Sequence, residues 1–375
     1  MNSVIQEIEK IRNGKPFRLI DSFYNRYSVV CREADGTRTA YCFSVPIRSV
    51  KTGELVDLRF SHRKNGSVLN GSEATVTITD RAHFANPYGC CEVFFKGRLT
   101  KKTVDTIQFF DADVQTEIRP TLNGLLFVLD CKANAQPEFV LKTDRIFAST
   151  RANDRYFSVM REKFVPLVTV SCVGLLNAKG KVTSPCRIEN EQTGEKEYTV
   201  RFVSESKSRF RVAVEINMQE TKLFQDTTVE SYFPKRNNAF GSVAFLGKSR
   251  QFGEQWLYSR LESANIRQLQ NKKILKTILH IPQLGTNKKN LSVRRVVKRF
   301  CSFGSNWENK IAVFDPVAES TVSNGYQHLD ISEILGSLKN KSENYVIQAP
   351  NANSPIIVST GDCFHAPQIL EVQFQ

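Results

Sequence analysis

The sequence predicts a mainly β protein, made of two or three packed antiparallel β-sandwich units with a short N-terminal helix. The chain has 375 residues, which is long for a single hydrophobic core. It contains 26 Phe residues, many of them in short runs with Val, Ile and Thr, and such runs are typical of β-strands. Hydrophobic residues make up 41% and charged residues 24%, close to the globular average, which excludes a disordered chain.

Residues 1–16 are predicted to form an amphipathic helix. Gly14 and Pro16 would end it, because neither residue continues a helix well. Apolar side chains recur at three- and four-residue steps, at Val4, Ile5, Ile8 and Ile11. We expect the helix to pack on the β domain that follows, and docking on a partner subunit is the alternative.

Residues 17–118 are predicted to form a first β-sandwich domain. Asp35-Gly36 lies between two strand-like runs and predicts a hairpin, because a type I′ turn needs residues that tolerate positive φ. The segment 74–79 alternates apolar residues with threonine, so one face of that strand is expected to be buried.

Residues 119–221 are predicted to form a second β-rich unit. Segments 125–129, 167–176 and 198–203 have strand-like composition. The segment 154–164 is predicted to be a helix that ends at Pro166. No linker rich in Pro, Gly or Ser separates the units, so we expect them to pack together. Whether 17–221 is one domain or two stays open.

Residues 222–375 carry a distinct series of strand and turn signals. Asp226 opens an alternating run that ends at Pro234, which has no N–H to give to a strand ladder. Asn237-Asn238 and Gly241 predict a tight turn, because these residues tolerate positive φ. Further marks are the strand with Arg260, the helical turn 266–273, Trp307, the run Leu329-Asp330-Ile331-Ser332 and a closing strand over 367–374.

The order and spacing of these motifs resemble the DNRLRE family of β-sandwich domains. The resemblance covers 222–375 and not the preceding residues. It implies a jelly-roll-like sandwich, related in shape to carbohydrate-binding modules. It also implies a role on bacterial surface proteins or phage-related proteins, where such domains are generally non-catalytic.

The sequence lacks the common motifs of nucleotide-binding, metallopeptidase and serine-hydrolase chemistry. Nucleotide-binding loops, H-E-x-x-H and G-x-S-x-G are absent, so we predict no cofactor and no enzyme activity. The nine cysteines include no C-x-x-C pair, which favours reduced, buried thiols over disulfides or a metal site. His280 lies in an apolar run and is expected to be a sheet residue.

Two pairs of residues would suit chemistry if they converged. Cys363, beside Asp362 and His365, would make a nucleophile and base, but neighbouring strand residues point to opposite faces, so we do not expect them to meet. Asp111 and Asp113 would share a strand face and would suit Ca²⁺ or a glycosidase acid pair. A solvated strand face is the favoured interpretation of that pair.

Two sets of residues are predicted to contact partners. The net charge of +14 favours anionic partners. The densest basic run, over 288–299, is helical by one pattern and a strand by the other. Its candidate contacts with an anionic partner are Lys288, Lys289, Arg294, Arg295, Lys298 and Arg299. The candidate glycan or partner contacts are Trp256, Tyr258 and Trp307, with core packing as the alternative.

The leading functional prediction is a non-enzymatic structural or attachment protein, a component of a phage or phage-tail-like particle. We expect other protein subunits as partners, with an anionic surface polysaccharide as a further candidate and nucleic acid as an unfavoured one. The alternatives are a carbohydrate-binding bacterial surface protein and, third, an accessory nucleic-acid-binding protein. No membrane span or signal peptide is visible, so synthesis in the cytoplasm and location in a particle are expected.

Overall fold

The computed structural model describes residues 3–20, 25–147, 149–204, 206–218, 222–335, 338 and 344–375. The chain forms two compact units: unit 1 is Met1–Leu55 with Thr221–Gln375, and unit 2 is Val56–Glu220. Both are antiparallel β-sandwiches, which confirms the predicted fold class. Among the described residues, every helix is too short or too polar to traverse a lipid bilayer.

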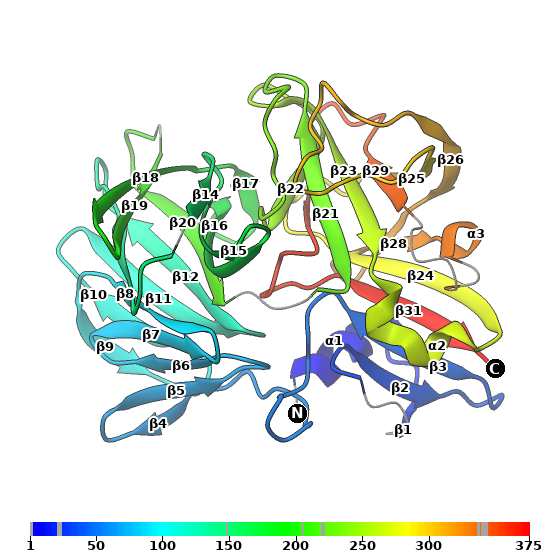
Figure 1. Cartoon of the computed structure of the whole chain (residues 1–375), viewed down its shortest axis with the longest axis horizontal. Helices are drawn as coiled ribbons and strands as arrows, with labels where there is room; N and C mark the ends of the chain where they lie inside the picture. The colour runs from blue at the N-terminus through cyan, green and yellow to red at the C-terminus, as the bar shows by residue number, and fades with distance from the viewer. Residues whose placement is uncertain are drawn as a thin grey trace. The chain divides into compact units, whose positions relative to one another are not determined.

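Sheet I of unit 1 joins the two ends of the chain. Figure 1 shows the blue strands β2 and β3 beside the red strand β31. In spatial order the sheet contains β1 (Arg18–Ile20), β2 (Ser28–Arg32), β3 (Arg38–Phe43), β31 (Ile369–Phe374), β24 (Ile274–Pro282), β28 (Tyr326–Asp330) and β27 (Thr321–Ser323).

Sheet II of unit 1 faces sheet I across the core. In spatial order it contains β26 (Val313–Glu319), β25 (Ser292–Val296), β29 (Asn344–Gln348), β23 (Gly253–Leu261), β22 (Val243–Ser249) and β30 (Ile356–Ser359), with β21 (Phe224–Glu230) paired to β23. Leu279 and Leu370 of sheet I share one buried cluster with Leu257 and Ile347 of sheet II. Short helical turns connect the strands: η1 (Ser263–Ile266), α2 (Arg267–Gln270) and α3 (Ser332–Leu335).

The predicted N-terminal helix is present as α1 (Ser3–Arg12) and belongs to unit 1. It buries Val4 and Ile8, two of the residues in the predicted apolar pattern. Its last residue, Arg12, donates a hydrogen bond of 2.9 Å to the Tyr41 hydroxyl on β3, and Asn324 donates one of 3.0 Å to the Lys10 carbonyl. The expectation that the helix packs on the β domain is therefore confirmed.

Unit 2 also consists of two sheets. Sheet III contains β14 (Ser149–Ala152), β15 (Tyr156–Glu162), β16 (Val165–Leu176), β20 (Phe210–Met218), β12 (Gly124–Cys131), β11 (Val114–Thr121), β10 (Ile107–Phe110) and β9 (Arg98–Lys102), with β17 (Val182–Ser184) paired to β16. Sheet IV contains β18 (Arg187–Gly194), β19 (Glu197–Val203), β13 (Glu138–Thr143), β8 (Gly89–Phe94), β7 (Arg81–Asn86), β6 (Thr75–Ile78), β5 (Gly66–Asn70) and β4 (Ser61–Arg63). One apolar cluster, with Phe127 from sheet III and Phe139 from sheet IV, fills the space between them.

The unit boundaries differ from those predicted. Residues 17–118 do not form a sandwich, because β1 to β3 belong to sheet I while β4 to β10 belong to unit 2. The physical cause is the long-range pairing of β3 with β31, which places Ala40 opposite Val372. Unit 2 is thus a continuous segment inserted between β3 and β21, and the open question about 17–221 is answered by a division near residue 55.

One local prediction was wrong, and another was confirmed except for its turn type. The expected helix over 154–164 is strand β15, which pairs with β16 through a register shift next to Pro166. Cross-strand pairing in the sheet overrides the local helical pattern. The hairpin at Asp35-Gly36 is confirmed, but only Gly36 has a positive φ, of 87°, so the turn is not type I′. Asp35 instead accepts a 2.9 Å hydrogen bond from the Thr37 N–H, as in an Asx turn.

Candidate functional site

The basic segment is a strand at its centre, so the helical alternative is wrong. Residues Ser292–Val296 form β25 between β26 and β29. Val293 is buried in the core of unit 1, whereas Arg295 on the same strand is exposed. Arg294 is half-buried and donates a 3.3 Å hydrogen bond to the Phe314 carbonyl on β26. Burial of Val293 thus fixes β25 in the core, and Arg295 on the same strand reaches the surface.

The structure separates the six predicted cationic contacts. Arg295, Lys298 and Arg299 line a surface cavity of about 420 Å³, together with Asn344 and Ile334. We call this the cationic cavity. Its described lining contains no carboxylate, so it suits an anionic group.

The remaining predicted cations lie apart from the cationic cavity. Lys289 lines a different cavity and donates a 3.1 Å hydrogen bond to the Asn351 carbonyl. Lys288 is exposed. Of the six predicted cationic contacts, three therefore line the cationic cavity.

The predicted aromatic contacts form a packed cluster on sheet II. Trp256 and Tyr258 extend from the same face of β23, as their spacing indicates, and the Trp256 and Trp307 ring centroids are 5.2 Å apart. Tyr258 is 1% exposed and donates a 2.8 Å hydrogen bond to the Ile311 carbonyl. That burial excludes the Tyr258 ring from direct contact with a glycan. Lys310 Nζ lies 3.9 Å from the Trp307 ring centroid, so the half-buried Trp rings are also partly covered.

Asp111 and Asp113 do not share a strand. β10 ends at Phe110 and β11 begins at Val114, so both carboxylates lie in the connecting turn. They line one cavity of about 320 Å³ with Lys96 and Glu138. The two carboxylates therefore lie in a turn that lines a cavity, and the prediction that they share one face of a strand is wrong.

A chain of hydrogen bonds on the outer face of sheet I runs from buried Glu371 and His280 to the surface at Ser323. His280, 3% exposed, places Nε2 3.1 Å from Glu371 Oε2 and Nδ1 2.6 Å from His328 Nδ1. His328 Nε2 is 2.8 Å from the Ser323 hydroxyl. We call this the histidine chain. It confirms that His280 is a sheet residue, and it pairs two histidines that are distant in sequence.

Burial and the neighbouring charges set the ionisation of the histidine chain. Burial lowers the pKa of His328, and the adjacent His280 lowers it further. Burial alone would raise the pKa of Glu371, but the hydrogen bond from His280, the His280 and Arg12 charges and a hydrogen bond from Gln373 together outweigh burial, so the pKa lies below its usual value. Only one of the two facing Nδ1 atoms can carry a proton, so protonation of both rings would break the chain.

A second buried cluster contains one amine and two carboxyl groups. Lys222 precedes β21, Asp226 lies within it, and Asp362 follows β30. Lys222 Nζ contacts Asp362 Oδ1, and the exposed fractions of the two side chains are 15% and 2%. Asp226, 3% exposed, accepts a 2.5 Å hydrogen bond from the Gly361 N–H. We call these three residues the Lys222 cluster.

Burial shifts both ends of the Lys222 cluster toward their neutral forms. It lowers the pKa of Lys222 to about 8, against the opposing effect of the Asp226 charge. It raises the pKa of Asp226 to about 6, although the Gly361 N–H and Lys222 act in the other direction. The Phe240 ring, with its centroid 5.4 Å from Lys222 Nζ, contributes to this apolar setting. The sequence marked Asp226 only as the start of a strand motif. No local pattern indicates that it lies near Asp362, because the two residues are far apart in the chain.

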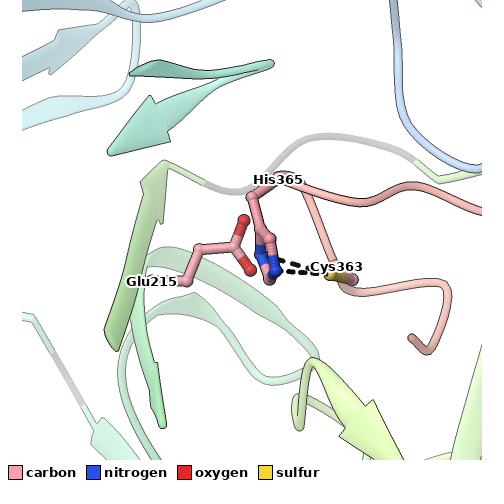
Figure 2. Close-up of side chains that lie close together, drawn as sticks. All are labelled: Glu215, Cys363 and His365. Atoms are coloured by element: carbon pink, nitrogen blue, oxygen red, sulfur yellow. Dashed lines mark hydrogen bonds between the residues drawn. The ribbon is translucent and has the colours of Figure 1, made fainter. Parts of the chain in front are cut away.

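Cys363 and His365 meet, contrary to the prediction. Figure 2 shows the His365 ring beside the Cys363 thiol, with Sγ 3.3 Å from Nδ1. The premise that they lie on a strand was wrong, because 360–368 is an irregular connection between β30 and β31. Cys363 is fully buried. All nine cysteines are free thiols and most are buried, as predicted.

Comparison with known proteins adds no relative. No family model matches the chain, and no curated protein sequence does. The resemblance of 222–375 to DNRLRE domains, and with it the jelly-roll-like connectivity, therefore stays a prediction.

Proposed function

We propose that this chain is a non-enzymatic structural or attachment protein, a component of a phage or phage-tail-like particle that contacts an anionic surface of a neighbouring subunit. The observation that carries the proposal is the cationic cavity where β25 ends and β29 begins in sheet II. Three cations on a short segment give a local positive field, and such a field favours a negatively charged partner.

The way the cations are held supports a role in docking. Val293 fixes β25 in the core, and α3 supplies Ile334 to the cavity wall. Arg295 also hydrogen-bonds the Glu333 carbonyl of α3. Arg295 thus extends from a packed framework, which limits the conformational entropy that its side chain loses on binding. The two sandwich units, one inserted into the other, are consistent with a structural component.

Particle incorporation tests the proposal. Particles are sedimented from a lysate of the source culture, and peptide mass spectrometry locates this chain. We expect it to co-sediment with sheath, baseplate or capsid proteins and to be released as the salt concentration rises, because screening weakens ionic contacts. A chain found only in the unsedimented fraction would contradict the particle role.

A charge-reversal variant tests the cavity separately. Lys298→Glu with Arg299→Glu should reduce incorporation at least tenfold, on the order of the loss expected for close charge pairs at an interface. The matched control is Lys101→Glu with Lys102→Glu, which reverses two exposed cations on β9 of unit 2. Equal losses in both variants would show that net charge, and not the cationic cavity, drives incorporation.

A further inference from the structure

We propose that the side chains of Lys222 and Asp362 become joined by an intramolecular isopeptide bond, formed by the folded protein itself. The inference is independent of the proposed function. It rests on three observations within unit 1: an amine and a carboxyl group in contact, their burial, and a third carboxyl group, Asp226, beside them.

The first requirement of the reaction is proximity. Lys222 Nζ contacts Asp362 Oδ1, which places the amine next to the carboxyl carbon that it would attack. Reacting groups held together in a folded site gain a large effective concentration over the same groups in solution. The two residues precede β21 and follow β30, so the fold, and not the local sequence, creates this encounter.

The second requirement is a neutral amine, since an ammonium group has no lone pair. Burial lowers the pKa of Lys222 to about 8, so a larger fraction is unprotonated near neutral pH than for an exposed lysine. The same burial makes the charged amine and carboxylate costly. Conversion of the two groups into one neutral amide removes both charges.

The third requirement is a group that carries protons. Burial raises the pKa of Asp226 to about 6, so this carboxyl group can both donate and accept a proton. Its position depends on Gly361, the residue before Asp362. A Cβ on Gly361 would lie 3.0 Å from Asp226 Oδ2 and 3.1 Å from the Phe224 Cβ, so a larger residue would push the two segments apart.

The proposed reaction balances without any cofactor or oxidant. Neutral Lys222 Nζ attacks the carboxyl carbon of Asp362 and forms the C–N bond. Asp362 reacts as its neutral carboxylic acid, which it becomes when the Lys222 ammonium group gives it a proton. Asp226 then donates its proton to the Asp362 hydroxyl, which leaves as water, and the amine gives a proton back to Asp226. One C–N bond forms, one C–O bond breaks, and one water molecule is released for each chain.

The consequence is a covalent link between the start of β21 and the segment that precedes β31. β21 and β30, the strand just before Asp362, both belong to sheet II, and the segment after Asp362 leads to β31 in sheet I. The bond would fasten this connection between the two sheets of unit 1 to the start of β21. A link of this kind suits a protein that must resist unfolding after assembly.

Intact-mass measurement of the purified, reduced full-length protein tests the proposal. We expect a mass lower than the sequence mass by one water molecule. Tryptic digestion should then give a branched peptide that contains Lys222 and Asp362, because trypsin does not cleave after an acylated lysine. A wild-type protein with the full sequence mass would overturn the proposal and leave the pair as an ion pair.

Three variants test which residues take part in the proposed reaction. Lys222→Arg and Asp226→Asn should each show their full calculated mass, and Asp226→Asn keeps the size of the side chain, so a folded but unlinked protein is expected. Lys276→Arg is the matched control, because it alters an exposed ion pair with Asp330, 3.5 Å apart, and should still lose water.

One other source of water loss must be distinguished. Succinimide formation at Asp35-Gly36 would release the same mass, but it would persist in Lys222→Arg and would give no branched peptide. Water loss that survives in Lys222→Arg would overturn the proposal. So would water loss that survives in Asp226→Asn, since it would remove the proposed role of the third carboxyl group.

Discussion

Unit 1 and unit 2 are both antiparallel sandwiches, yet they fill their interiors differently. In unit 2 a ladder of rings runs between the sheets, with centroid distances of 4.8 Å for Phe95–Phe109, 4.9 Å for Phe127–Phe139 and 5.1 Å for Phe139–Phe202. Unit 1 also has an apolar core, but it buries the Lys222 cluster and, on the outer face of sheet I, the His280–Glu371 pair of the histidine chain.

The difference between buried rings and buried ionisable groups indicates which unit is the better candidate for a functional site. Aromatic burial and edge-to-face ring contacts stabilise a sandwich directly. Buried ionisable groups cost free energy unless each finds a partner, so a protein keeps them when they do something that an apolar residue cannot. Unit 2 also buries Glu215 and Arg155, but its interior is filled mainly by rings, whereas in unit 1 buried ionisable side chains contact one another, as in Lys222–Asp362 and His280–Glu371.

The two tryptophans make this comparison measurable. Both Trp residues of the chain, Trp256 and Trp307, lie in unit 1. Tryptophan fluorescence therefore reports the unfolding of unit 1, while far-ultraviolet circular dichroism reports both units. Each variant below can be assigned to one unit by the probe that changes.

The largest expected effect comes from Asp226→Asn. If this variant prevents the Lys222–Asp362 link, unit 1 should lose about 5 kcal/mol of stability, the value that the chain-entropy model gives for a loop of roughly 100 residues or more. The measurement is the guanidinium midpoint by tryptophan fluorescence. An unchanged midpoint, in a variant whose mass shows no link, would mean that the bond does not stabilise the unit.

Phe127→Ala should cost unit 2 about 3–5 kcal/mol, because it removes a fully buried ring and leaves a cavity. The circular dichroism transition should move to lower guanidinium concentration while the tryptophan transition stays in place. Phe110→Ala is the control, since Phe110 is 46% exposed. A matching shift in the tryptophan signal would show that the two units do not unfold separately.

Acid should weaken unit 1 through the histidine chain. The pKa of His328 is lowered in the folded state, so its contribution is fully present above the unfolded value of about 6.5 and is lost as pH falls through the folded value. The tryptophan midpoint should therefore fall between about pH 7.5 and about pH 5.5. His328→Gln should flatten this dependence, and an equal slope in the variant would assign the effect to other groups.

Asp226 gives a pH dependence of the opposite sign in an unlinked protein. Its pKa is raised to about 6, so its stabilising contribution is present below about 3.8 and is lost as pH rises through about 6. Comparison of Lys222→Arg with Lys222→Arg/Asp226→Asn isolates this contribution. In the wild-type chain, where Lys222 and Asp362 are proposed to be linked, the histidine chain should dominate.

The smallest expected effect on stability is that of Lys298→Glu with Arg299→Glu. Both side chains are exposed, and surface substitutions usually change the free energy of unfolding by about 0.5 kcal/mol or less. Both probes should therefore give the wild-type transition. A shift of the tryptophan midpoint would mean that these cations support the fold, and the incorporation test would then need a different variant.

Local patterns predicted much of the fold. The alternation at 74–79 became β6 with every second residue buried, and the apolar steps of the first helix became the buried side of α1. Such patterns succeed because side chains alternate in strands and recur at three and four residues in helices. The segment 154–164 failed because its state depended on a partner strand, β16.

The candidate sites, like the fold, depended partly on local sequence and partly on long-range contacts. The sequence by itself determined the β-rich composition, the excess of positive charge and the position of the basic run, whereas the structure decided that this run is a strand at its centre. Only the tertiary structure decided that β3 meets β31, that His280 meets His328 and that Lys222 meets Asp362. The reason is that sequence periodicity records which face of an element is buried, whereas the partner across a sandwich is chosen by long-range pairing, and that pairing leaves no local trace.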